Sequence, residues 1–216
     1  MKKILCTIGE FNSEAKNILS SLGTVTYAEP NQEALSNTIK DAEIVVVQLG
    51  LNFTAEVIDA APNLQVIATA TTGLDHIDTA HAESKGITII SLKKETEFLN
   101  SITSTAELAL GLLISLMRHI PAAHTSVLMG SWERETFRGN TLRGKTLGVI
   151  GYGRLGKMMA RYGEALEMSV IFSDPKEPGS VSQEELLKNA DVISIHIHLN
   201  TKTENSFGAA EFAQMK

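Results

Sequence analysis

The 216-residue sequence has only one cysteine and no stripe of basic residues. Cys6 has no internal disulfide partner, and its place in an apolar run predicts a buried, reduced thiol. Lys and Arg number 19 against 25 Asp and Glu, so the formal net charge is −6. A nucleic-acid phosphate backbone is therefore a poor partner for this chain.

Long hydrophobic runs are also absent. The longest apolar helix expected, residues 106–117, is too short for a bilayer and contains Glu107 and Ser115. The apolar run at the N-terminus is interrupted by Glu10, and no small-residue cleavage pattern follows it. We therefore expect a cytoplasmic protein with no membrane partner.

Short β-branched apolar runs alternate with helical patterns, which predicts βαβ units and an α/β fold with parallel sheets. The continuous run Ile44–Val47 is typical of a strand buried on both faces. Asp78 is expected to cap a helix that Gly86 ends. In the first half, the expected strands cover residues 3–8, 24–27, 44–49, 66–70 and 87–91, and the expected helices cover residues 13–21, 32–40, 55–60 and 79–84.

The helix expected at residues 105–119 is apolar almost all round, which predicts that it is buried between layers or between domains. It divides a domain of residues 1–100 from one of residues 101–216. A polar, irregular stretch is expected at residues 121–143. The expected strands after it cover residues 146–151, 169–173 and 192–196, and the expected helices cover residues 154–167, 182–189 and 209–216.

The most informative motif is Gly-Tyr-Gly-Arg-Leu-Gly at residues 151–156, which follows an expected strand and opens an expected helix. Gly151 permits the tight turn, Gly153 lets a diphosphate approach the backbone, and Gly156 lets the helix pack on the sheet. The helix N-terminus offers unpaired N–H groups to the phosphates, and Arg154 is placed to add a further contact. The bland alternative is a purely structural turn.

Asp174 lies 23 residues after the first of these glycines, at the end of the next expected strand. A carboxylate there accepts hydrogen bonds from an adenosine ribose and repels a 2′-phosphate, which favours NAD over NADP. The alternative is a loop residue that caps Pro175. Strand, glycines, helix, strand and acid agree in their order, which favours the dinucleotide site.

The chain resembles the D-isomer-specific 2-hydroxyacid dehydrogenase family, which includes the 3-phosphoglycerate dehydrogenases. The resemblance covers almost the whole chain and is weakest in the first 61 residues. Residues 66–78, 104–109, 142–156 and 190–196 carry it, and the third of these segments is the most specific. It implies a flavodoxin-like first domain that binds substrate and an incomplete Rossmann NAD-binding domain. It further implies an oxidoreductase for small 2-hydroxy or 2-keto acids, and a homodimer formed through residues 105–119 and the segment around Trp132.

The resemblance also implies roles for particular residues. Backbone N–H groups of Thr72 and Gly73 would hold the substrate carboxylate, and Thr72 would lie near the nicotinamide. A strand end followed by glycine can aim N–H groups at an anion, although an ordinary turn before a helix is the alternative. The residues expected to bind the cofactor are Thr72, Gly151, Gly153, Arg154, Leu155, Gly156, Asp174, His196 and Ile197.

Two departures from the family pattern stand out. His198 occupies a position where the family usually has proline, which affects the local backbone. The family's catalytic arginine, glutamate and histidine are expected beyond Lys216, so the chain is expected to be an inactive fragment of a longer enzyme. An NAD(H)-binding regulatory module without turnover is the alternative. His196 and His198 lie on one face of a strand, but no third ligand follows at metal spacing, so no metal is expected.

Overall fold

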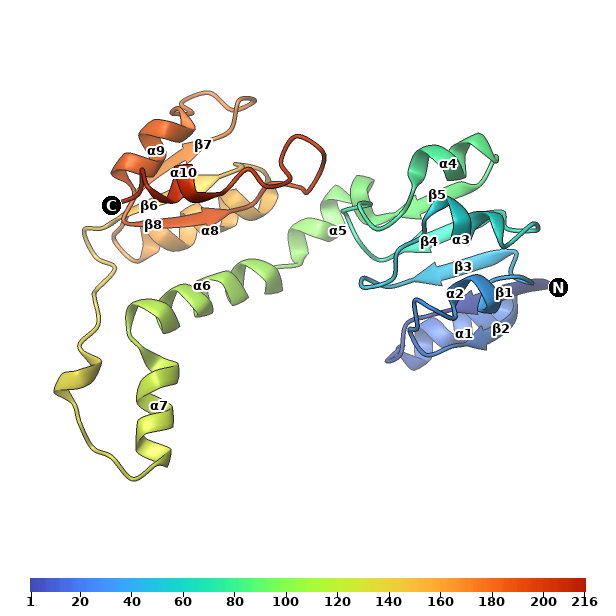
Figure 1. The fold of residues 1–216 in the computed structure, drawn as a ribbon, viewed down its shortest axis with the longest axis horizontal. Coiled ribbons are helices and arrows are strands. Elements are labelled where there is room, and N and C mark those ends of the chain that lie inside the picture. Colours follow the sequence, from blue (N-terminus) through green and yellow to red (C-terminus); the bar gives the residue numbers. More distant parts are fainter. The chain divides into compact units, whose positions relative to one another are not determined.

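The computed structural model describes residues 1–216, and they divide into two compact units, Met1–Leu99 and Asn100–Lys216 (Figure 1). Each unit is built on its own parallel sheet with helices packed on it.

The first unit has a five-stranded parallel sheet with the order β2-β1-β3-β4-β5. This is the strand order of flavodoxin-like folds, as the sequence resemblance implied. Its strands are β1 (Lys2–Cys6), β2 (Gly23–Tyr27), β3 (Ile44–Val47), β4 (Val66–Thr69) and β5 (Thr88–Ser91), and its helices are α1 (Ser13–Leu22), α2 (Leu35–Thr38), α3 (Ala55–Asp59), α4 (Thr79–Ser84) and α5 (Thr96–Ser101), which runs into the second unit.

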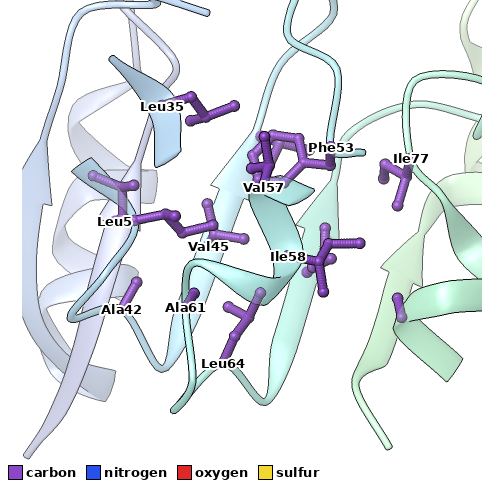
Figure 2. Close-up of a cluster of buried hydrophobic side chains, with 14 of the residues drawn as sticks. Leu5, Leu35, Ala42, Val45, Phe53, Val57, Ile58, Ala61, Leu64 and Ile77 are labelled. Carbon is purple, nitrogen blue, oxygen red and sulfur yellow. The ribbon is translucent and has the colours of Figure 1, made fainter. Parts of the chain in front are cut away.

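Both faces of this sheet contribute to the core. On one face, Val45 of β3 lies in a cluster with Ile58 of α3 (Figure 2). Ile67 of β4 belongs to the same cluster. On the other face, Cys6 and Val46 pack with partly buried side chains, including Leu19 of α1. Cys6 is fully buried, as predicted. Each fully buried Val, Leu or Ile stabilises the fold by roughly 1.5–3 kcal/mol.

The limits of α4 follow from its capping residues. The side chain of Asp78 accepts a hydrogen bond from the His81 backbone N–H at 3.0 Å. Lys85 caps the other end, and Gly86 follows with φ +74°, a left-handed conformation that favours glycine. Both predictions for this helix are confirmed. By contrast, α2 covers only Leu35–Thr38, much less than the predicted residues 32–40.

The second unit has a three-stranded parallel sheet with the order β7-β6-β8. Leu147 and Val149 of β6 pack on the side of α8 and α6, whereas Ile150 packs with Leu186 of α9. The strands are β6 (Thr146–Ile150), β7 (Ser169–Ser173) and β8 (Val192–Ile195), and the helices are α6 (Ser104–Met117), α7 (Ile120–Leu128), α8 (Arg154–Ala165), α9 (Gln183–Asn189) and α10 (Ala209–Phe212).

The prediction of an irregular stretch at residues 121–143 was wrong in its first part. Helix α7 occupies Ile120–Leu128, and a 3₁₀ turn follows at Glu135–Phe137. His119 has φ +55°, so a left-handed residue separates α6 from α7, and Pro121 is tolerated in the first turn. The last helix was predicted through residue 216, but α10 ends at Phe212.

Helix α6 is not buried all round, contrary to the prediction from its composition. Ala106 and Leu113 are buried, but Leu108, Leu112 and Leu116 are exposed by 64%, 62% and 73%. No element of the second unit covers these three side chains. Helices α5 and α6 together cover Thr96–Met117. By length and composition alone, this segment is long and apolar enough to cross a membrane. Core helices of soluble proteins reach the same length and apolar composition.

Candidate dinucleotide site and substrate loop

The glycine loop joins the carboxyl end of β6 to the N-terminus of α8. Gly151 has φ +84°, and a Cβ atom there would lie 2.7 Å from the carbonyl oxygen of His196. Only glycine meets both conditions without strain. A Cβ atom on Gly156 would collide with the carbonyl oxygen of Gly151, so this glycine permits the close contact between helix and loop. These two roles agree with those the motif predicts.

The space above Gly153 is open. Gly153 is exposed, and no atom lies within 4 Å of the position that its Cβ would take. It precedes the first turn of α8, and Lys157 N–H donates to its carbonyl at 2.9 Å. No side chain caps this helix, so the site has a bare backbone and N–H groups that no intrahelical partner takes. A diphosphate fits this arrangement.

Asp174 is held against the glycine loop at the end of β7. One carboxylate oxygen accepts from the Tyr152 backbone N–H at 2.9 Å, and the other accepts from the Lys176 N–H at 3.0 Å. These backbone hydrogen bonds, from Lys176 and then Tyr152, hold the pKa of Asp174 below its ordinary value. The carboxylate is therefore ionised at neutral pH and lies beside the loop, where the sequence places a ribose ligand.

An aromatic pair adds a second tie between the loop and β7. The rings of Tyr152 and Phe172 stack with centroids 3.8 Å apart and planes inclined by 14°. The Lys157 ammonium lies 5.7 Å from the Tyr152 ring and 2.7 Å from a carboxylate oxygen of Glu177. The sequence patterns did not predict these contacts. An aromatic residue inside the glycine motif, with another two positions before the acid, was the available signal.

The side chain of Arg154 makes a different contact from the phosphate contact that the sequence predicts. Its Nη1 atom donates to the carbonyl oxygen of Ile102 at 2.7 Å, so the side chain is tied to the segment between α5 and α6. Its backbone remains at the first position of α8, beside Leu155. The backbone of residues 154–156 can serve a diphosphate while the guanidinium serves another contact.

His196 and Ile197 follow the end of β8, on the same sheet edge as the glycine loop. The His196 backbone N–H donates to the Ile150 carbonyl at 2.7 Å, and its ring Nε2 lies 2.8 Å from Ser194 Oγ. Burial lowers the pKa of His196, so the ring is neutral at neutral pH. No group of three or more His, Cys, Asp or Glu residues is placed to hold a metal ion.

Thr72 and Gly73 lie in the loop of residues 70–78, between β4 and α4. Thr71 Oγ1 donates to the Gly73 carbonyl at 2.7 Å and lies 2.9 Å from Thr69 Oγ1. Thr72 and Gly73 are half-buried. The hydroxyl chain fixes the loop directly beside these two residues, at the carboxyl edge of the first sheet.

The far end of this loop is held by His76. Its carbonyl accepts from the Phe53 N–H at 2.7 Å, and Asp78 N–H donates to the Phe53 carbonyl at 2.9 Å. The His76 side chain is only 6% exposed, and neither ring nitrogen has a hydrogen-bond partner. Burial lowers the pKa of His76, although the charge of Asp75 opposes the change.

Comparison with known proteins identifies relatives of both units. Residues 110–216 match the family described as "D-isomer specific 2-hydroxyacid dehydrogenase, NAD binding domain". A D-3-phosphoglycerate dehydrogenase from Methanocaldococcus jannaschii is 37% identical, and the match covers 100% of this chain and 42% of the relative. A hydroxypyruvate reductase from Thermotoga maritima is 35% identical over 89% of this chain and 63% of the relative.

Solved structures give the same result. D-lactate dehydrogenase from Aquifex aeolicus, solved with NAD and lactic acid, superposes with a TM-score of 0.84 at 27% identity. The match covers 99% of this chain and 66% of that structure. The chain thus spans less than two thirds of the length of these relatives. Fold, glycine loop and relatives agree, and the chain belongs to the D-isomer-specific 2-hydroxyacid dehydrogenase family, with residues 110–216 in its NAD-binding domain.

Proposed function

We propose that this chain binds NAD through the loop of residues 151–156 and Asp174, and that the whole protein transfers a hydride between NAD and C2 of a small 2-hydroxy or 2-keto acid. The observation that carries the proposal is the ionised Asp174 carboxylate held on the Tyr152 N–H, beside the open backbone of Gly153. When bound, NAD supplies the hydride chemistry.

The residues of this chain bind and orient the reactants. N–H groups at the start of α8 hold the diphosphate, and the Asp174 carboxylate accepts hydrogen bonds from the ribose hydroxyls. An ionised carboxylate at that point repels a 2′-phosphate, so we propose NAD over NADP. His196 and Ile197 line the adenine side.

For the substrate, we propose that the backbone N–H groups of Thr72 and Gly73 hold its carboxylate. The support is their place at the carboxyl edge of the first sheet and the hydroxyl chain that fixes the Gly73 carbonyl. N–H groups that converge in a turn form a favourable site for an anion. The choice of substrate lies with the side chains around this loop.

We further propose that the protein forms a homodimer through its second unit. The support is a set of exposed apolar side chains that follow one another from α6 to the segment after α7. Leu112, Leu116, Leu128 and Trp132 are exposed by 62%, 73%, 74% and 87%. An apolar surface of this kind typically marks a protein interface.

Titration of the chain with NADH, followed by cofactor fluorescence, tests the binding half of the proposal. We expect saturable binding that weakens when NADPH replaces NADH. Saturable binding without reduction of any 2-keto acid would favour a binding module for this chain. Absence of saturable NADH binding by folded chain would contradict the proposal altogether.

A further inference from the structure

Ile102 lies between helices α5 and α6. Helix α5 ends at Ser101 and α6 begins at Ser104, so Ile102 and Thr103 belong to neither helix. Carbonyl groups at the end of a helix lack an intrahelical donor and need one from elsewhere. We call residues 100–103 the linker, because the first unit ends at Leu99.

Arg154 supplies that donor from 52 residues further along the chain. Its Nη1 atom lies 2.7 Å from the Ile102 carbonyl oxygen, and the contact is partly buried. A guanidinium donor makes a charge-assisted hydrogen bond, which is stronger than one between neutral groups. The Ile102 carbonyl is thereby fixed to the first residue of α8.

Arg154 also occupies the first position of α8, directly after Gly153. Its backbone is therefore part of the proposed diphosphate site, while its side chain contacts the linker. An anion that ordered the start of α8 would restrict the Arg154 backbone, and the Nη1 contact would pass that restriction to Ile102. One residue joins both places by a short covalent path.

We propose that Arg154 is a positioning residue that couples dinucleotide binding to the conformation of the linker, through the hydrogen bond of its guanidinium to the Ile102 carbonyl. This inference rests on the proposed NAD site and gives it a route of regulation. It replaces the sequence-based expectation that the Arg154 side chain contacts the phosphates. The backbone of residues 154–156 still holds the diphosphate.

Amide hydrogen exchange of the whole chain, with and without saturating NAD⁺, tests the inference. In the wild type we expect NAD⁺ to slow exchange in residues 151–156 and in residues 100–105. In Arg154→Gln, we expect NAD⁺ still to slow exchange in residues 151–156. The linker should no longer be slowed by NAD⁺ and should exchange about tenfold faster than in the NAD⁺-bound wild type. Arg154→Lys keeps a charged donor and should retain an intermediate response.

Arg161→Gln is the matched control, because Arg161 lies on the same helix with an exposed side chain. It should leave both responses unchanged. Equal linker protection in the wild type and Arg154→Gln would overturn the coupling. A loss of NAD⁺ affinity beyond about tenfold, with the linker response retained at saturation, would assign the side chain to the phosphates instead. Absence of protection at residues 151–156 in the wild type would contradict the NAD site itself.

Discussion

In the first unit the exposed large apolar side chains are distributed over several elements, whereas in the second most of them follow one another from α6 to the segment after α7. Ile18 of α1 and Ile90 of β5 are examples from the first unit, exposed by 58% and 55%. In the second unit the larger exposed set runs from Leu108 to Trp132, and a smaller one includes Leu199 and Phe212. The first sheet has five strands and the second has three. The comparison teaches that apolar composition alone does not predict burial, because Leu108, Leu112 and Leu116 of α6 are exposed.

The largest expected effect separates fold from binding within the glycine loop. Gly156→Ala places a Cβ atom against the Gly151 carbonyl, so we expect the second unit to lose about 3 kcal/mol of stability and its NADH binding. Gly153→Ala meets no atom of the chain and should leave the melting temperature unchanged while it blocks NADH. Calorimetry and NADH titration of both variants measure the difference. Equal melting temperatures for the two variants would contradict the packing role of Gly156.

The second effect concerns the apolar face of the second unit. Leu112→Glu places a charge in the proposed dimer interface, and we expect the dimer dissociation constant to rise by at least about a hundredfold. Ile18→Glu is the matched control, because its exposure is close to that of Leu112 but it lies in the first unit. Sedimentation equilibrium compares both variants with the wild type. A wild-type chain that stays monomeric at high concentration would remove the proposed interface.

The third effect concerns Asp174. Because its lowered pKa keeps the carboxylate ionised from neutral to mildly acidic pH, the ribose contact should persist over that range. The stability it contributes is present above its ordinary pKa and is lost as the pH falls through the folded value. Asp174→Asn should weaken NADH binding about tenfold and reduce the preference for NADH over NADPH. Glu177→Gln is the control, because it removes a nearby carboxylate. It should change neither the NADH affinity nor the preference for NADH over NADPH by more than about threefold.

The smallest effect is a pH response confined to the first unit. Burial lowers the pKa of His76, so the unfolded chain binds its proton first and the stability of the unit falls as the pH drops below the ordinary value of 6.5. His76→Leu removes the unpartnered nitrogens, and we expect about 1 kcal/mol more stability at pH 7 and no such pH dependence. Urea unfolding, followed through the β3 and β4 amides at pH 5.5 and 7.5, measures this.

The His76→Leu experiment has a control variant and an outcome that would contradict it. His124→Gln changes an exposed histidine of the second unit and should leave the first unit's pH response intact. If His76→Leu kept the wild-type response, the titrating group would have to be another residue.

Sequence patterns predicted the elements that apolar runs and caps define. The strand at Ser169–Ser173 and the helix at Thr79–Ser84 were predicted with their observed limits. Helix α7 was missed because polar residues interrupt its pattern and Pro121 stands in its first turn. The hydrogen bond from Arg154 to Ile102 joins residues 52 positions apart, and no periodic pattern reports such a contact.

For the candidate site, the backbone geometry of the glycine loop could be predicted, whereas the contacts of its side chains could not. Glycine is typical of positions where two backbone segments lie in close contact, so the roles of Gly151 and Gly156 could be assigned from their spacing. The stack of Tyr152 on Phe172 depends on how the loop lies beside β7, which only the fold determines. The exposed face of α6 could not be predicted either, because apolar composition does not tell which side chains find a packing partner within the unit.

The central claim is that residues 151–156 hold a dinucleotide diphosphate while Asp174 holds its ribose. A crystal structure of the chain with NAD⁺ tests this most directly. We predict diphosphate oxygens within hydrogen-bond distance of the backbone N–H groups of residues 154–156, and the ribose hydroxyls on the Asp174 carboxylate. NAD⁺ bound elsewhere, or a ribose that leaves Asp174 bonded only to Tyr152 and Lys176, would contradict the account.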